Sequence, residues 1–270
     1  MTSRMFPFIT KTWSPIAGGF SIEKDKIYAC PYRCQYCWAN LLINKFPKGN
    51  LGKKYTGSYR IHKPAMDPWF KTDDFVFVQC MSDIGAPGIP QAVIIDVFEA
   101  IKFYEAKGTR FLLLTKNPKF YRDWCEHIPE ETILGATIET DQPISFDISL
   151  APEPYRRILK MEWCADNLPN DRFICVEPIM KMSPDFERDI MKTRPKFMAV
   201  GYDNYNNKLP EPSLERTEIL IKEFEAQGVK VFRKTLRDPL PSMQSQLSEN
   251  RRGSQSDLPS VPKRRGGERN

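Results

Sequence analysis

The chain has 270 residues, 41% of them hydrophobic and 27% charged, with a formal net charge of +6, which is typical of a soluble globular protein. No apolar run approaches the length of a membrane-spanning helix, and the first residues lack an apolar stretch followed by a small-residue cleavage site. These features exclude an integral membrane protein and a secreted disulfide scaffold, so we expect a cytoplasmic protein with no membrane partner.

The first predicted element, a short strand at about residues 26–29, precedes a group of three cysteines. Cys30, Cys34 and Cys37 form a C-x3-C-x2-C pattern with the aromatic Tyr36 before the last cysteine. These thiolates can bind one small iron–sulfur cluster, and because a four-iron cube normally takes four cysteines, one iron is left without a protein ligand. A catalytic metal centre needs such an open position.

A zinc site made of the same cysteines and Cys80 is the main alternative. Zinc sites usually combine two C-x2-C pairs, and the sequence has no second pair. The only two histidines, His62 and His127, are far apart, which argues against a histidine-built metal site. A non-catalytic iron–sulfur or zinc module that binds nucleic acid remains the second hypothesis.

A basic insertion at residues 38–74 follows the cysteines. It carries six cations between positions 45 and 63, with no acidic residue among them: Lys45, Lys48, Lys53, Lys54, Arg60 and Lys63. It also carries the aromatic residues Tyr55, Tyr59, Trp69 and Phe70. Cations interleaved with aromatics suit single-stranded nucleic acid or a flipped base. The alternative is a solvated lid or barrel plug whose aromatics pack on the core, and both interpretations stay open.

From residue 75 to about 234 the pattern predicts alternating strands and helices. The strands are short apolar runs at residues 75–80, 110–115, 133–139, 172–177, 197–201 and 229–233. Helix ends are marked by Pro90 and Gly108, by Ser183 as an N-cap, and by Ser213 and Gly228.

This alternation implies parallel strands joined by right-handed crossovers. No G-x-G-x-x-G follows any predicted strand, so a dinucleotide-binding sheet has no support. We therefore predict an α/β fold, a partial or full parallel (β/α) barrel of about six βα units, in one domain over residues 1–237. In such barrels the chemistry lies at the carboxyl ends of the strands. Residues 238–270 are rich in Ser, Pro and Arg with few large apolar residues, which predicts a disordered basic tail.

With these elements in place, the chain resembles the radical SAM superfamily, whose signature is C-x3-C-x-Φ-C after the first strand of a partial (β/α)6 barrel. Within it, the chain is similar to an uncharacterised subgroup associated with phages and mobile elements. The resembling stretches lie at residues 13–18, 75–83, 111–118, 134–140, 174–178 and 198–201. Ser14, Trp38 and the Tyr202-Asp203 pair depart from the pattern and leave the substrate unassigned.

The resemblance implies a [4Fe–4S] cluster held by Cys30, Cys34 and Cys37, and S-adenosylmethionine (SAM) as the second cofactor. It implies reductive cleavage of SAM to a 5′-deoxyadenosyl radical that takes hydrogen from a substrate, which could be nucleic acid or a nucleotide. It also implies an electron donor of the flavodoxin or ferredoxin type.

Carried over by position, a set of residues would contact SAM. Tyr36 would lie against the adenine, Met81, Ser82 and Asp83 near the methionyl amino group, and Thr137 and Glu139 near the ribose. A capping role in the next turn is the alternative for Ser82 and Asp83. Lys116, Glu177 and Lys234, at strand ends, are candidate catalytic groups, although charged residues there are often merely solvated.

Overall fold

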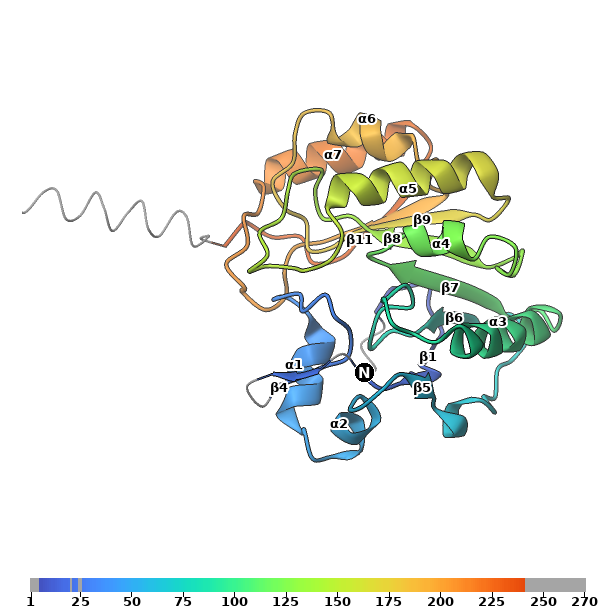
Figure 1. The fold of residues 1–270 in the computed structure, drawn as a ribbon. Helices are drawn as coiled ribbons and strands as arrows, with labels where there is room; N and C mark the ends of the chain where they lie inside the picture. The colour runs from blue at the N-terminus through green and yellow to red at the C-terminus, as the bar shows by residue number, and fades with distance from the viewer. Residues whose placement is uncertain (1–4, 20, 24–25, 241–270) are drawn as a thin grey trace, which may run out of the picture.

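The structure is a computed structural model that describes residues 5–19, 21–23 and 26–240 (Figure 1). Its centre is a seven-stranded sheet in which every neighbouring pair is parallel. The strands, in spatial order, are β1 (Lys11–Trp13), β6 (Phe75–Val78), β7 (Arg110–Thr115), β8 (Ile133–Thr137), β9 (Arg172–Val176), β10 (Phe197–Val200) and β11 (Lys230–Arg233). The sheet curls into a half-barrel whose edge strands β1 and β11 do not pair, which confirms a partial barrel.

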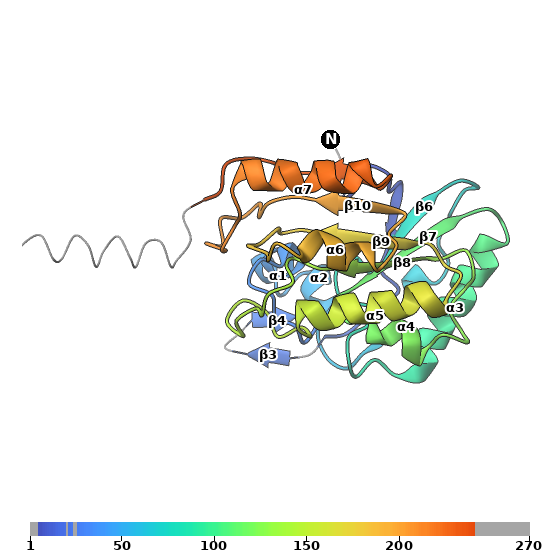
Figure 2. The same cartoon turned by 90° about the horizontal axis from the view of Figure 1, so that it is seen from above.

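Helices cover the outer face of this sheet (Figures 1 and 2). They are α3 (Gln91–Glu105), α4 (Lys119–Asp123), α5 (Pro154–Asn167), α6 (Phe186–Met191) and α7 (Leu214–Ala226). Each connects two consecutive strands, as predicted for βα units. None of the helices in the part of the chain that the structure describes is long and apolar enough to traverse a bilayer.

Strand alternation divides the core into two clusters. On the outer face, side chains such as Val76, Leu113 and Ile174 pack against the helices. On the inner face, Phe77 and Phe173 pack around Phe6, which comes from the segment before β1. This aromatic cluster fills the amino-terminal part of the half-barrel.

The segment between β1 and β6 contributes to the carboxyl end of the half-barrel before its last residues, 68–74, return to the amino-terminal side beside the end of α3. It contains β2 (Ile16–Ala17) paired with β5 (Arg60–Ile61), the hairpin of β3 (Ser21–Glu23) and β4 (Lys26–Tyr28), helices α1 (Trp38–Lys45) and α2 (Asn50–Lys54), and a 3-10 turn at Lys63–Ala65. The strand predicted at 26–29 is present as β4, but it belongs to the hairpin and not to the main sheet. The first sheet strand is β1, which the sequence did not reveal because it is only three residues long.

Helix ends test the capping predictions. Ser213 caps α7, because its Oγ accepts a bond of 3.1 Å from Arg216 N. The Ser183 prediction is wrong: α6 begins only at Phe186. The Ser183 hydroxyl instead donates to the carboxylate of Asp141, in the loop after β8, and accepts from Asp185 N at 3.1 Å in a turn that precedes the helix.

The predicted tail at 238–270 lies outside the described residues from position 241 onward. Of its first residues, Leu240 donates a backbone bond of 2.8 Å to Glu211. The division into a domain over 1–237 and a tail stays a prediction.

Most aromatic residues of the basic insertion are core residues. Tyr55 is buried, Phe70 packs edge-on against Trp13, and Tyr59 packs against the outer cluster. Trp69 alone of the four is strongly exposed, at 76%. These contacts favour the lid interpretation for Tyr55, Tyr59 and Phe70, because the rings attach the insertion to the barrel, and nucleic-acid binding by the insertion stays a prediction.

Candidate active site

A cavity of about 1050 Å³ opens at the carboxyl ends of the strands. Its walls bring together groups that are far apart in sequence: the three motif cysteines, Tyr36, the 81–83 turn, and residues at the ends of β7, β8, β9 and β11. All the predicted site residues except Glu139 line it. Typical small-molecule sites have volumes of about 300–1,000 Å³, so this space is sufficient for a cofactor and part of a substrate.

The cysteine loop forms one wall of this cavity. Cys30, Cys34 and Cys37 are free thiols, and Cys34 is buried. The loop turns tightly, with a bond of 3.0 Å from Cys37 N to Cys34 O. Apolar side chains including Tyr32 and Met180 pack around the sulfurs. The loop therefore presents its thiols to a partly apolar space.

The electrostatics of these thiols fit a metal cluster. Burial raises the pKa of Cys30 well above its usual range, and nearby Cys34 and Cys37 raise it further. Burial and Cys34 likewise raise the pKa of Cys37 to about 11. Three adjacent thiolates thus repel one another unless a cationic group binds them, and metal binding supplies that compensation.

Two cations also face this loop. Lys116 and Arg157 both interact electrostatically with Cys34, and the buried Arg157 Nη2 has no hydrogen-bond partner among the described residues. Cys34 Sγ lies 3.1 Å from Ser149 Oγ, which is the kind of contact that orients a metal-bound sulfur. The residues present fit an anionic, thiolate-bound cluster.

The part of the chain with described coordinates contains no group of three or more His, Cys, Asp or Glu side chains that could hold a metal ion. A [4Fe–4S] cube is larger than one ion and takes ligands that are farther apart. Cys80, the fourth ligand in the zinc alternative, lies 3.5 Å from the hydroxyl of Ser14.

Behind the cavity wall, Glu139 is the centre of a buried charge network. Its carboxylate accepts hydrogen bonds from Tyr36 and from Lys116, and a bond of 2.6 Å from Arg157 Nη1. Burial alone would raise the pKa of Glu139, but Arg157 and Lys116 outweigh it and lower the pKa to about 2. Glu139 is therefore ionised and fully engaged, and it positions Tyr36 and Lys116, which do line the cavity.

Arg157, on α5, is the residue of this network that sequence reasoning missed. It is 1% exposed, on the same helix face as Met161 and Cys164. The sequence did contain a signal for Arg157: it lies four and seven residues before the apolar Met161 and Cys164, and so on the same helix face. A charged residue on a buried helix face needs an oppositely charged or hydrogen-bonding partner.

The 81–83 turn is organised mainly by its own hydrogen bonds. The Asp83 carboxylate accepts from Thr115 Oγ1 at 2.5 Å, Lys116 N at 2.7 Å and Gly85 N at 2.9 Å, and Ser82 Oγ accepts from Gln79 Nε2 at 2.6 Å. The bond from Gly85 N is the capping role weighed as the alternative for Asp83, whereas the bonds from Thr115 and Lys116 join the turn to the end of β7. Ser82 and Asp83 still line the cavity beside Met81, and a carboxylate has one further acceptor site for a ligand.

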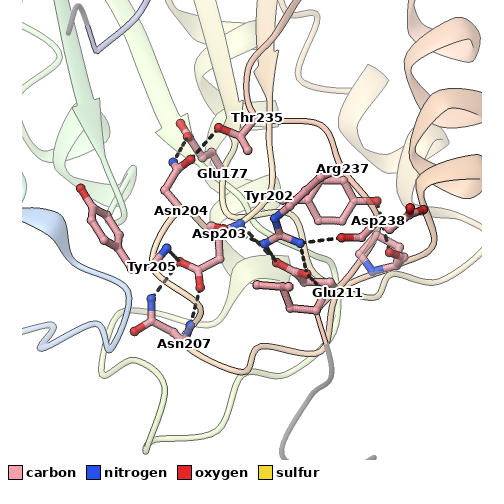
Figure 3. Close-up of polar contacts among 12 residues, drawn as sticks. Glu177, Tyr202, Asp203, Asn204, Tyr205, Asn207, Glu211, Thr235, Arg237 and Asp238 are labelled. Atoms are coloured by element: carbon pink, nitrogen blue, oxygen red, sulfur yellow. Dashed lines mark hydrogen bonds and ion pairs between the residues drawn. The ribbon is translucent and has the colours of Figure 1, made fainter.

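At the other end of the cavity, Glu177 and Lys234 form an ion pair of 2.5 Å. Asn204 Nδ2 lies 3.3 Å from Glu177, and Thr235 donates to Asn204 Oδ1 at 2.5 Å (Figure 3). Cys175 shares the inner face with Glu177, and burial followed by the Glu177 charge raises its pKa to about 12.

The loop after β10 holds Asn204 and Tyr205 at the cavity (Figure 3). The buried Asp203 carboxylate accepts from Tyr205 N at 3.1 Å and from Asn207 N at 2.5 Å. Arg237 binds Glu211 through two bonds of 2.8 Å and donates to Asp203 O at 2.7 Å. The loop also contacts the cysteine loop, since Gln35 donates to Asn207 O at 3.0 Å.

These contacts predict that Arg237 limits the motion of the 203–211 loop. Replacing Arg237 by glutamine leaves the buried Glu211 carboxylate without its cation, so we expect amide exchange at Tyr205 and Asn207 to accelerate by about tenfold or more. Hydrogen–deuterium exchange mass spectrometry measures this rate. Arg188→Gln, which removes an exposed ion pair on α6, is the control. Equal amide exchange rates in both variants would contradict the role of Arg237 in limiting the motion of this loop.

The chain matches one family model and has similar solved structures. The family model, described as "Protein of unknown function (DUF5131)", matches residues 5–187. No curated protein sequence matches the chain. Among solved structures, one similar structure is a mutant of spore photoproduct lyase with one cysteine replaced by serine. It has a TM-score of 0.54 and 12% sequence identity, and the match covers 87% of this chain and 81% of the lyase chain.

A second solved structure, a double mutant of that lyase with bound AdoMet and dinucleoside spore photoproduct, has a TM-score of 0.46 and 12% identity. It covers 79% of this chain and 60% of its own. The likeness at the higher TM-score establishes a shared half-barrel fold.

Proposed function

Since the chain belongs to the DUF5131 family, whose function is unknown, we propose from its own site that it is a radical SAM enzyme. The observation that supports this most directly is the cavity itself: three free thiols of one short loop line the same space as polar groups at the carboxyl ends of parallel strands. The half-barrel fold shared with spore photoproduct lyase supports it further.

In this proposal Cys30, Cys34 and Cys37 hold three irons of a [4Fe–4S] cluster and leave the fourth iron for SAM. When bound, these cofactors supply a one-electron cleavage of SAM to methionine and a 5′-deoxyadenosyl radical, which removes hydrogen from a substrate. Tyr36 and Thr137 would contact the nucleoside part of SAM, and Met81, Ser82 and Asp83 its methionyl part.

The remaining residues orient the side chains that line the cavity and shape the cavity itself. Glu139 holds Tyr36 and Lys116 in place through its buried hydrogen bonds. The aromatic cluster around Phe6 fills the amino-terminal part of the half-barrel. The Glu177–Lys234 pair lines the cavity, and we assign it to substrate binding or proton transfer.

Two further parts of the proposal concern partners and compartment. A reducible cluster requires an electron donor, of flavodoxin or ferredoxin type. The seven free cysteines fit a reducing compartment such as the cytoplasm. Membership of the phage-associated subgroup stays a prediction, because no comparison tests it.

Anaerobic reconstitution tests the proposed function. We expect the chain to take up about four irons with sulfide and, with SAM and a strong reductant, to release 5′-deoxyadenosine. Iron and sulfide analysis and chromatography of the nucleoside measure the two results. A colourless protein with one zinc, or an iron-loaded protein that leaves SAM intact, would overturn the proposal.

A further inference from the structure

A second, open pocket of about 530 Å³ lies beside the cysteine cavity and is strongly cationic. Its lining consists of Asn50, Leu51, Lys53, Lys54, Arg60 and His62. It therefore collects three cations and a histidine, with no acidic side chain in its wall. The pKa of His62 is lowered, first by partial burial and then by Lys54 and Arg60, which shows that these cations act on the same space.

The pocket is built on backbone that is held in place. Gly18 N donates to Lys54 O at 2.8 Å, and Gly19 N donates to Gly57 O at 2.9 Å. A Cβ at Gly52 would lie 1.9 Å from the carbonyl oxygen of Pro47, so α2 packs too closely for any larger residue there. The cations therefore project from a fixed support, which lowers the entropy cost of binding an anion.

The pocket shares a wall with the candidate active site. Leu51 and Lys54 line both the basic pocket and the cysteine cavity. Lys54 Nζ donates to Ser14 O at 2.7 Å, which holds this shared wall against β1. An anion in the pocket would lie next to, and outside, the space assigned to the cluster and SAM.

We infer that this pocket binds a backbone phosphate of single-stranded nucleic acid, whose neighbouring nucleotide enters the cysteine cavity as the substrate. This inference rests on the proposed function, because it names the substrate class of that same site. Lysine and arginine side chains on a fixed support suit phosphate oxygens. The remaining cations of the basic insertion, Lys45, Lys48 and Lys63, extend the positive charge beyond one phosphate.

The position of the pocket favours a nucleic-acid strand over a free nucleotide. A ligand that fills both spaces must carry phosphate outside its reacting unit, as a phosphodiester chain does. At the far end of the cavity, the exposed ring of Tyr205 and the amide of Asn204 offer a stacking surface and hydrogen-bonding groups for a base.

Fluorescence anisotropy of a short, labelled, mixed-sequence single strand, as DNA and as RNA, tests the inference with the full chain. We expect Lys53→Gln/Arg60→Gln to weaken binding by about tenfold or more. Because each phosphate contact contributes about 0.7 to the salt slope for single strands and the pocket binds one phosphate, we expect the slope to fall by about 0.7. Arg156→Gln/Lys222→Gln removes the same charge from exposed positions on α5 and α7, and is expected to change affinity less than about twofold.

Three outcomes would overturn the inference. One is equal affinity of the pocket and control variants. Another is equal competition by polyglutamate, which would mean that any polyanion binds. The third is competition by inorganic phosphate or a nucleoside monophosphate as effective as that of the strand, which would mean a free nucleotide ligand.

Two further measurements keep the test decisive. Arg60 donates to Thr56 O and Ser58 O, so its replacement could disturb the loop, and the single variant Lys53→Glu at an exposed position repeats the test without that risk. Release of 5′-deoxyadenosine by the wild-type chain without nucleic acid is measured separately. Failure there would refute the proposed function, whereas failure of the strand-binding assay would refute only this inference.

Discussion

Replacement of Cys30, Cys34 or Cys37 by alanine, one at a time, is expected to abolish both iron uptake and SAM cleavage. Each thiol lines the cavity and would bind a different iron, so two remaining ligands cannot hold the cube. Reconstituted variants should contain less than about one quarter of the wild-type iron. They should release 5′-deoxyadenosine at least about 100-fold more slowly. This loss of rate exceeds the one expected from replacing a residue that only hydrogen-bonds to a metal ligand.

Two other cysteines provide matched controls. Cys125 is exposed and Cys164 is fully buried on α5, and neither lines the cavity. Cys125→Ala controls for loss of a thiol, and Cys164→Ala controls for loss of buried volume. Both should keep the wild-type iron content. If either lost iron as the motif variants do, or if a motif variant kept it, the assigned ligand set would be wrong.

The second large effect is expected from Glu139→Gln, which we predict to lower the free energy of unfolding by about 3–5 kcal/mol. The substitution removes the negative charge that Lys116 and Arg157 share, and leaves the buried Arg157 and the partly buried Lys116 without it. Urea denaturation at pH 7 measures the change. Glu99→Gln, which breaks an exposed Glu–Lys pair on α3, should cost less than about 0.5 kcal/mol.

The same pair of proteins gives a pH test. The pKa of Glu139 in the folded chain is about 2, below its usual 4.5, so its stabilisation is complete above pH 4.5 and is lost as the pH falls through 2. This depression corresponds to about 3 kcal/mol. The stability difference between wild type and Glu139→Gln should therefore shrink on acidification over this range. A stability difference between the two proteins that is absent at pH 7, or that stays unchanged down to pH 2, would contradict the stabilising role of the Glu139 charge network.

Much of the site could be predicted because strand alternation is a local property. Cys175 and Glu177 share the inner face through a period of two residues; the same period relates Thr137 to Glu139, although only Thr137 of these two lines the cavity. Since parallel strands end at one edge, this pattern also places Lys116 and Lys234 near them. The C-x3-C-x2-C motif could also be recognised from the sequence, because all three cysteines lie in one short loop.

Other features depended on contacts between distant parts of the chain. Arg157 reaches Glu139 from a helix, and Gln35 reaches Asn207 across 172 positions. The aromatics of the basic insertion looked available for stacking, yet Tyr55 and Phe70 are attached to the core.

The amino-acid sequence by itself therefore determined the parallel (β/α) architecture, the cysteine loop and the row of polar residues at the strand ends, since each follows from short-range periodicity or spacing, but it left open whether the barrel is partial or full. Only the tertiary structure decided which of these groups face the cavity and which are used in holding it together. It also decided that the basic segment forms a pocket sharing a wall with that cavity. The physical reason is that burial and charge pairing are set by side chains that become neighbours only when the sheet curls and the helices pack on it.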